Sequence, residues 1–207
     1  MGNIWKFDIA QILEKYPRIR SFVETGTCEG AGVRFAQTLG FEQIHSIEIM
    51  EELWQHCKNQ TEFSEDDKVN LHLGHSPSVL KDILQHVGPR LPNDDPGDIL
   101  FWLDAHFPGV DTVITKKGIH DESDPERRCP LHKEIEAIVS TKRHIGSVFI
   151  IDDLRVYEDG PFASGNWPER HLYGGDGIQF IFDLLGDTHN ISRYYCDNGY
   201  IVAIPMN

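Results

Sequence analysis

Short apolar runs alternate with amphipathic segments along most of the chain. The apolar runs, which predict β-strands, occupy residues 21–24, 46–49, 69–73, 99–103 and 148–151. The segments with helical spacing lie at residues 7–16, 30–39, 50–60, 76–87 and 131–141. A strand that is apolar at consecutive positions is buried on both faces, so this alternation predicts a parallel sheet with helices above and below it.

The last part of the chain has a different pattern. Residues 192–196 and 200–204 read as two strands on either side of Asp197-Asn198-Gly199, and an Asn-Gly pair is a common β-hairpin turn. We therefore predict an α/β fold with a doubly wound, mostly parallel sheet that ends in an antiparallel β-hairpin. A length of 207 residues with 40% hydrophobic content suits one domain over residues 1–207. Residues 108–130, rich in Gly, Pro and charge, are predicted to form a lid or an insertion loop.

Composition and charge narrow the classes of partner and the compartment that we expect for the protein. A net charge of −14 argues against binding nucleic acid through its phosphates. We find no apolar run long enough for a membrane-spanning helix and expect no secretory signal. The four cysteines are scattered without a C-x-x-C pair, which suits a reducing compartment. We expect a cytoplasmic protein that acts on a small molecule, with neither nucleic acid nor membrane as partner, and leave its oligomeric state open.

An acid and a glycine-rich turn follow the first predicted strand. The sequence there reads Glu24-Thr25-Gly26-Thr27-Cys28-Glu29-Gly30-Ala31-Gly32. Glycines permit a close approach of the backbone to a ligand, although such turns also occur where a helix merely packs on a strand. Glu48 ends the second predicted strand, about 20 residues further on. A carboxylate at this place can accept hydrogen bonds from both ribose hydroxyls of a nucleoside. The alternative is that Glu48 is a solvated acid before a helix.

The acids of this turn indicate which nucleoside it binds. Glu24 and Glu29 disfavour a pyrophosphate and favour a ligand with positive charge, such as S-adenosylmethionine (SAM). Here the chain resembles the class I SAM-dependent methyltransferases, which have a Rossmann-like sheet. Glu24-x-Gly26-x-x-x-Gly30 stands for their first motif, so the resemblance implies cofactor contacts from Glu24, Gly26, Thr27 and Gly30, and from Glu48 on the ribose. Cys28 departs from the pattern, because many members have glycine there.

Three further carboxylates follow predicted strands. Asp104 comes directly after residues 99–103, and Asp152 and Asp153 come directly after residues 148–151. The carboxyl ends of adjacent parallel strands meet at one edge of a sheet, where these acids would repel one another without a cation. Mg²⁺ is the first choice for such oxygen ligands, and Mn²⁺ or Ca²⁺ could take its place. The alternative is that each acid is a helix cap or a solvated side chain.

A narrower resemblance includes these acids. Trp102-Leu103-Asp104-Ala105-His106, Cys129-Pro130-Leu131-x-x-Glu134-Ile135 and Phe149-Ile150-Ile151-Asp152-Asp153 are similar to motifs of the metal-dependent sugar O-methyltransferases of macrolide and aminocoumarin biosynthesis. The similarity extends over residues 22–205. It implies that Asp104, Asp152 and Asp153 hold Mg²⁺, which binds two hydroxyls of the acceptor sugar. Gly74-His75-Ser76 stands where that group tends to have an acid on the adenine amino group, so His75 and Ser76 are further candidate contacts of the cofactor. His75 could accept the same hydrogen bond if neutral, or the adenine could be held otherwise.

These observations together predict a SAM-dependent, Mg²⁺-dependent O-methyltransferase that acts on a small molecule such as a sugar or a glycosylated metabolite. His106 is the candidate general base beside Asp104, or else it packs near the metal and orients a ligand. Two alternatives remain open. One is a domain that binds SAM without turnover. The other is a Mg²⁺-dependent phosphoryl-transfer enzyme, which normally needs a phosphate cradle such as G-x-x-x-x-G-K-[ST], and the sequence lacks that motif.

Overall fold

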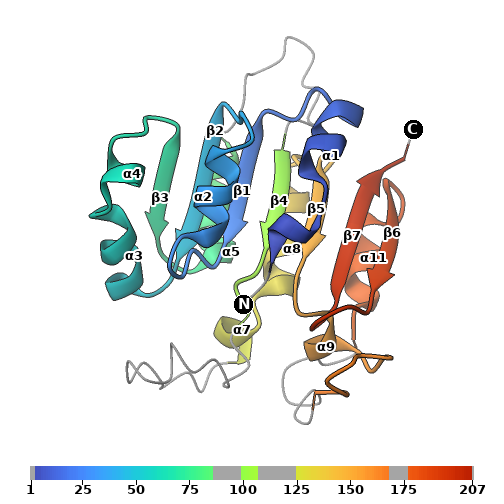
Figure 1. The fold of residues 1–207 in the computed structure, drawn as a ribbon. Coiled ribbons are helices and arrows are strands. Elements are labelled where there is room, and N and C mark those ends of the chain that lie inside the picture. Colours follow the sequence, from blue (N-terminus) through green and yellow to red (C-terminus); the bar gives the residue numbers. More distant parts are fainter. Residues whose placement is uncertain (1–2, 86–98, 107–124, 168–176, 207) are drawn as a thin grey trace.

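The centre of the molecule is a mixed sheet of seven strands. The computed structural model describes residues 3–85, 99–106, 125–167 and 177–206. The strands are β1 Ser21–Thr25, β2 Gln43–Glu48, β3 Val69–Leu73, β4 Ile99–Leu103, β5 Val148–Ile151, β6 His189–Tyr194 and β7 Tyr200–Pro205. Their order is β3-β2-β1-β4-β5-β7-β6, and the first five are parallel while β7 runs antiparallel to both β5 and β6. This arrangement confirms the predicted fold class (Figure 1).

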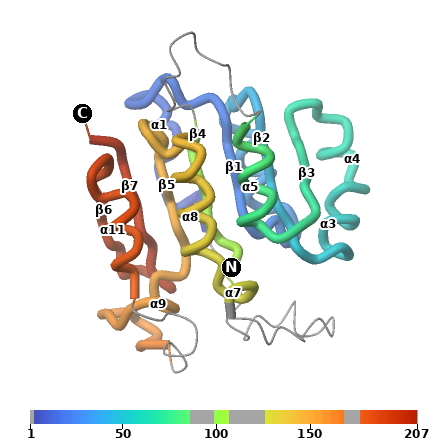
Figure 2. Tube along the Cα trace, turned by 180° about the vertical axis from the view of Figure 1, so that it is seen from behind, coloured from blue at the N-terminus to red at the C-terminus, as the bar shows by residue number. Residues whose placement is uncertain are grey.

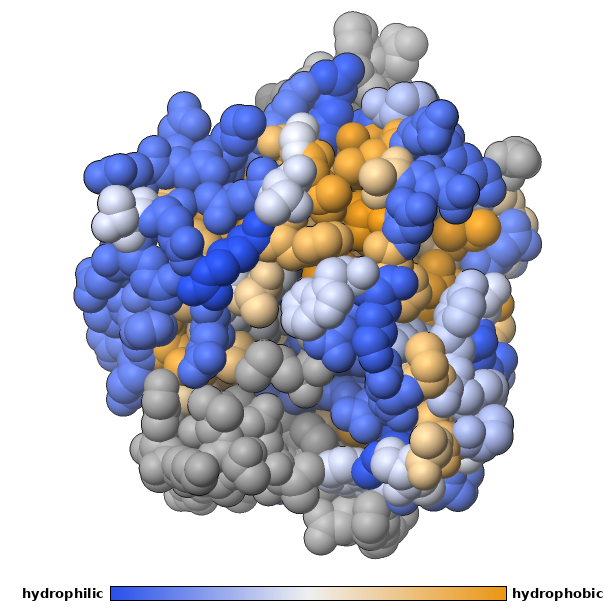
Figure 3. Space-filling view, in the orientation of Figure 1, coloured by the Kyte–Doolittle hydropathy of each residue, from blue (hydrophilic) through white to orange (hydrophobic). Residues whose placement is uncertain are grey.

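Helices cover both faces of the sheet. Those on the face seen in Figure 1 are α1 Ile9–Lys15, α2 Ala31–Gln37, α3 Glu51–Lys58 and α4 Thr61–Ser64, and they follow a 3-10 turn, η1, at Ile4–Lys6. The face seen from behind carries α5 Ser76–Leu84, α8 Leu131–Ser140 and α11 Gln179–Leu185 (Figure 2). The short helices α7 Pro125–Arg128 and α9 Leu154–Tyr157 lie below the sheet in Figure 1, near the carboxyl ends of β4 and β5. Over α3 and α4 the surface is hydrophilic, whereas apolar side chains show through near α1 (Figure 3).

The strand side chains alternate between the two layers of helices. Ile99, Phe101 and Leu103 of β4 pack into the core under α5, α8 and α11, whereas Leu100 and Trp102 pack toward α1 and α2. All five are buried because β4 is the central strand of the seven-stranded sheet and is covered on both faces. This two-sided burial explains the continuous apolar run in the sequence.

Local sequence features explain where the first helix begins and where the hairpin turns. The α1 helix begins after Asp8, whose carboxylate accepts the backbone N–H of Gln11 at 2.9 Å, as a helix cap does. The hairpin turn differs from the predicted Asn-Gly corner, because Gly199 N–H donates to Cys196 O at 2.8 Å and the turn therefore centres on Asp197 and Asn198. Glycine serves at 199 for another reason: its φ is +84°, and a Cβ there would lie 2.4 Å from the Phe162 ring.

Two predicted elements extend into residues that the structure does not describe. Residues 108–124 of the lid or insertion loop predicted at 108–130 lie outside the described residues, as does the end of the helix predicted at 76–87. Residues 125–130 are described, and they contain α7 where an irregular loop was expected. Among the described helices, none combines the length and the apolar character that crossing a bilayer requires.

Candidate functional site

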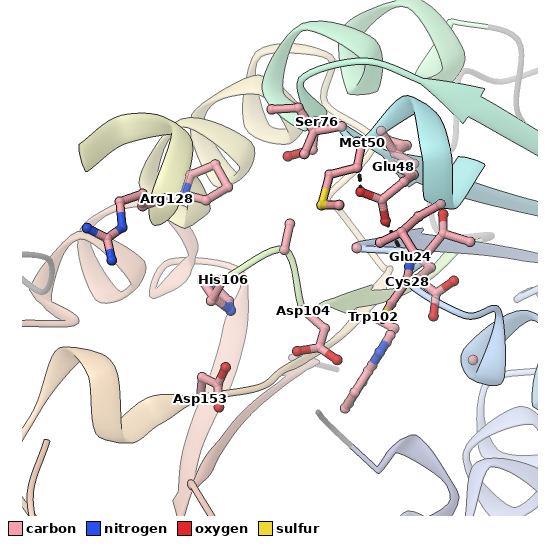
Figure 4. A pocket seen from close by; sticks show the side chains of 18 of the residues that line it. Glu24, Cys28, Glu48, Met50, Ser76, Trp102, Asp104, His106, Arg128 and Asp153 are labelled. Carbon is pink, nitrogen blue, oxygen red and sulfur yellow. Dashed lines mark hydrogen bonds between the residues drawn. The ribbon is translucent and has the colours of Figure 1, made fainter. Parts of the chain in front are cut away.

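A cavity of about 340 Å³ opens where the carboxyl ends of β1, β2, β4 and β5 meet. This volume lies in the range of small-molecule sites. Most of the predicted site residues line the cavity, namely Glu24, Gly26, Thr27, Glu48, His75, Ser76, Asp104, His106 and Asp153. Figure 4 shows that Glu48, Met50 and Cys28 lie on one side of it, and that Asp104, His106 and Asp153 lie on the other. Gly30 and Asp152 are not among the lining residues.

The glycine-rich turn is fixed by its contact with the loop after β4. Gly26 has a φ of +86°, and a Cβ at this position would lie 2.6 Å from the backbone oxygen of Asp104. Its N–H donates to Ile47 O of β2 at 2.9 Å. A side chain at residue 26 would therefore push the ends of β1 and β4 apart. Gly30 is needed for packing instead, because a Cβ there would lie 2.7 Å from the Phe63 ring.

Cys28, the residue that departs from the methyltransferase pattern, nevertheless adopts the backbone conformation of a glycine. Its φ is +50°, in the left-handed region that L-residues rarely occupy. The chain path of the turn is thus retained at a cost of about 1–2 kcal/mol in local strain. The Cys28 N–H donates to Glu48 Oε2 at 2.8 Å, which ties the turn to the end of β2.

Glu24 lies deep beneath this turn. Its carboxylate accepts a hydrogen bond from Ser46 Oγ, and that hydroxyl in turn lies 2.6 Å from Thr27 Oγ1. Gly32 leaves the space that the carboxylate needs, since a Cβ there would lie 1.8 Å from Glu24 Oε1. Burial, and to a smaller extent the charge of Glu48, raises the pKa of Glu24 to about 8 against the effect of the Ser46 hydrogen bond.

Glu48 is held by two backbone donors. Besides the N–H of Cys28, the N–H of Met50 donates to its carboxylate at 2.9 Å. Burial raises the pKa of Glu48, and these hydrogen bonds oppose the rise. The side chain is only 5% exposed, yet it lines the cavity. A ligand hydroxyl can still reach it, because each carboxylate oxygen accepts more than one hydrogen bond.

A second buried carboxyl group lies beneath Ser76. Ser76 Oγ, at the start of α5, donates to Glu134 Oε1 of α8. Glu134 is fully buried, and burial raises its pKa to about 7 although the Ser76 hydrogen bond lowers it. The sequence motif contained Glu134, but sequence reasoning assigned it no role. His75 lines the same part of the cavity, and its Nε2 has no hydrogen-bond partner among the described residues.

An acid–histidine group forms the opposite side of the cavity. One ligand atom each of Asp104, His106 and Asp153 lies within 4.8 Å of the others. Asp153 turns its side chain toward this group from a left-handed backbone, with a φ of +60° at the start of α9. Neither ring nitrogen of His106 has a hydrogen-bond partner in the described part of the chain. Burial lowers the pKa of His106 to about 3, so its imidazole is neutral at pH 7.

Asp152 joins the cluster without belonging to this group. It is 2% exposed, and its N–H donates to Leu103 O at 3.0 Å, which places it beside Asp104 in register. Burial and the charges of Asp104 and Asp153 raise the pKa of Asp152 well above its usual range. Burial and the charge of Asp153 do the same for the pKa of Asp104. The three predicted carboxylates thus come together, and only two of them share the group with His106.

The donor types in this group suit a hard divalent cation. Two carboxylates supply charge and oxygen, and a neutral imidazole, whose nitrogens have no hydrogen-bond partner among the described residues, supplies nitrogen. Oxygen ligands accommodate Mg²⁺ or Ca²⁺, and the nitrogen makes Mn²⁺ equally suitable. A buried imidazole with two unsatisfied nitrogens is costly by itself, so a ligand on one of them would stabilise the site.

The fold of the chain is shared with methyltransferases of known structure. Neither a protein-family model nor a curated protein matches the chain in sequence. The methyltransferase PaMTH1 of Podospora anserina, bound to S-adenosylhomocysteine (SAH), superposes with a TM-score of 0.60 at 14% identity, over 100% of this chain and 80% of that one.

Two further structures agree with this likeness. The O-methyltransferase TomG of Streptomyces achromogenes, which is involved in tomaymycin synthesis and was solved with SAM, gives a TM-score of 0.59 at 14% identity over 100% of this chain and 82% of that one. The O-methyltransferase of Bacillus cereus with SAH gives 0.57 at 14% identity over 100% and 83%. The chain therefore has the fold of methyltransferases that bind SAM or SAH, as the resemblance in its motifs predicted.

Proposed function

We propose that the chain is a SAM-dependent O-methyltransferase that acts, with a divalent cation, on a hydroxyl of a small molecule such as a sugar or a glycosylated metabolite. One observation carries the proposal: Asp104, His106 and Asp153 lie together in the wall of the cavity that also contains the Gly26 turn and Glu48. The fold shared with methyltransferases solved with SAM or SAH supports the same assignment.

The residues at the ends of β1 and β2 fit the methyl donor. SAM, when bound, supplies a methyl group on a positively charged sulfur. Glu48 would accept hydrogen bonds from the ribose hydroxyls, and Gly26 lets the turn lie against the loop after β4 at the cavity wall. Positive charge nearby favours the ionised form of Glu24, which opposes the effect of burial on its pKa.

The residues at the ends of β4 and β5 fit the cation. Asp104, Asp153 and His106 would hold it, with Asp152 beside Asp104. A divalent cation, when bound, lowers the pKa of an acceptor hydroxyl and positions it. We assign His106 to the ligand set rather than to the role of general base, because a pKa near 3 gives the imidazole little tendency to take up a proton at neutral pH.

Binding experiments on the purified chain test the two parts of the proposal separately. Calorimetry should detect binding of SAH and, independently, of Mn²⁺. EDTA should abolish methyl transfer from SAM to a panel of hydroxylated acceptors without displacing SAH. Failure of SAH to bind the folded protein would contradict the methyltransferase assignment, whereas activity that resists EDTA would contradict only the metal requirement.

A further inference from the structure

An arginine forms part of the cavity wall beyond the acid–histidine group. Arg155 lies in α9, just after Asp153, and it lines the cavity together with Trp167 and Asn198. Its guanidinium carbon lies 4.9 Å from the centre of the Trp167 ring. Its backbone N–H donates to Asn198 O at 2.8 Å, and its Nη1 lies 3.4 Å from Asn198 Oδ1. These contacts hold the charged group in one place.

Within the described part of the chain, no acidic side chain pairs with this arginine. Its side-chain partners, Ser164, Asn198 and the Trp167 ring, are all neutral. No ion pair joins Arg155 to any residue that the structure describes, whereas a surface arginine such as Arg20 pairs with a glutamate. A guanidinium carries its charge at every physiological pH.

Two N–H donors at this place are also unsatisfied. Arg155 Nε and Trp167 Nε1 are buried and have no hydrogen-bond partner within the described ranges. Neither group can accept a hydrogen bond, so an acceptor on a ligand would satisfy them. A fixed cation with unsatisfied donors is suited to an anion with oxygen acceptors.

We propose that Arg155, Trp167 and Asn198 form a subsite for an anionic group, a carboxylate or a phosphate, on the methyl acceptor. This inference rests on the proposed function and adds to it a class of substrate. The acceptor carries its hydroxyl at the acid–histidine group and its anion at Arg155. Trp5, Trp102 and Trp167 all line the cavity, and such aromatic surfaces suit an acceptor built on a ring.

The position of the subsite favours the acceptor over the cofactor as the source of the anion. SAM itself carries a carboxylate, so the same chemistry has two possible sources. The strand order β2-β1-β4-β5-β7 places α9, which follows β5, on the far side of β4 from the Gly26 turn and Glu48 (Figure 1). A ligand part that contacts Arg155 therefore lies beyond Asp153, away from the nucleoside end.

Matched pairs of acceptors test the subsite. The probes are 3,4-dihydroxybenzoate against its methyl ester, and glucose 6-phosphate against glucose, each added to the protein with Mn²⁺. Binding is measured by calorimetry in the presence of SAH, and turnover is measured as SAH release from SAM. The wild type should prefer at least one anionic member by about ten- to a hundredfold, the usual value of a charge-assisted hydrogen bond.

Two variants connect the preference to the arginine. Arg155→Gln should lose the preference while its affinity for SAH stays level. Arg20→Gln, which removes an exposed arginine paired with Glu42, should keep it. Equal binding of acid and neutral partner by the wild type, including no binding of either, would overturn the subsite, as would a preference that survives in Arg155→Gln.

The test has one further outcome, in which Arg155 binds the carboxylate of the cofactor. If Arg155→Gln, with an unchanged thermal unfolding midpoint, binds SAH more weakly, the anion at Arg155 belongs to the cofactor and the proposed subsite is wrong. If the wild type binds no SAH, the proposed function itself fails. The two failures are therefore distinguishable.

Discussion

The two walls of the cavity differ in how their acidic side chains are satisfied. In the β1–β2 wall, which contains Glu24 and Glu48, hydroxyl and backbone donors of the protein occupy the carboxylates. In the β4–β5 wall, which contains Asp104, His106 and Asp153, the acids lie close together beside an imidazole without partners among the described residues. The carboxyl groups of the first wall thus have hydrogen-bond donors from the protein. The second concentrates like charges.

This difference has an energetic consequence. A buried carboxylate is tolerated where fixed donors replace water, and it is costly where its neighbours carry the same charge. In the β1–β2 wall fixed donors hold the carboxyl groups in place, and Glu24, with a pKa of about 8, keeps a proton at neutral pH. The clustered acids of the β4–β5 wall must take up protons or a cation. Binding at one wall should be separable from binding at the other, and the following changes test that separation.

The largest effect is expected from removing one carboxylate of the β4–β5 wall. Asp153→Asn keeps the size of the side chain, and asparagine tolerates the left-handed backbone. Affinity for Mn²⁺ should fall by at least about tenfold, as expected when a metal site loses a contact. Methyl transfer should fall by roughly a thousandfold, because a bound cation contributes several kcal/mol to stabilising the transition state. Mn²⁺ calorimetry and SAH release measure the two effects.

A matched substitution checks that the effect is local. Asp183→Asn replaces an exposed aspartate of α11 and should leave both quantities unchanged. SAH affinity should remain level in both variants. Undiminished Mn²⁺ affinity in Asp153→Asn would show that the acid cluster does not bind the metal.

The next effect concerns the carboxyl group beneath the β1–β2 wall. The pKa of Glu134 is raised by burial from 4.5 to about 7. Between these values the folded protein keeps a proton that the unfolded chain releases, so the free energy of unfolding should fall as pH rises. The total change is roughly 3 kcal/mol and is complete above the folded pKa. Glu134→Gln cannot ionise and should lack this part of the pH dependence in urea unfolding.

The control variant replaces an exposed glutamate. Glu14→Gln, at an exposed position of α1, should leave the pH dependence of unfolding unchanged. If the stability difference between Glu134→Gln and wild type is the same at pH 5 and at pH 8, the buried carboxyl group does not titrate in this range and the prediction is wrong.

A smaller effect is expected from Glu48. Glu48→Ala removes the acceptor for the ribose and should weaken SAH binding by about ten- to a hundredfold, while Mn²⁺ affinity stays level. Because the N–H groups of Cys28 and Met50 also lose their acceptor, Glu48→Gln serves as a second variant that keeps an acceptor oxygen. Glu52→Ala, at an exposed position of α3, is the control. Unchanged SAH affinity in both Glu48 variants would place the ribose elsewhere.

The sequence predicts the β1–β2 wall well because its signals are local. Gly26 and Glu48 follow strands whose apolar runs are visible, and a parallel arrangement brings strand ends to one edge. Asp104 and Asp153 were found for the same reason. The site residues themselves remain predictions as far as ligand binding is concerned, since the structure gives only their positions.

Long-range packing determines what the sequence could not indicate. The left-handed backbone of Asp153 decides that its carboxylate, rather than that of Asp152, faces His106. Glu134 meets Ser76 only because α8 packs on α5. Arg155 and Trp167 come from a short helix and an irregular segment without periodicity, so no pattern connects them to the cavity.

The smallest effect is expected at Cys28, and it tests whether the β1–β2 wall is as relaxed as its hydrogen bonds suggest. Cys28 has a φ of +50°, and glycine would relieve its strain of about 1–2 kcal/mol while losing about 0.4–1 kcal/mol to the greater freedom of the unfolded chain. Cys28→Gly should therefore stabilise the protein by up to about 1.5 kcal/mol in urea unfolding. The backbone N–H that reaches Glu48 is kept, so SAH affinity should not fall. Cys196→Gly, at an exposed cysteine that is not among the residues of positive φ, should destabilise instead. If both variants lose stability equally, the turn stores no strain at Cys28, and its departure from glycine must be maintained by contacts of the thiol.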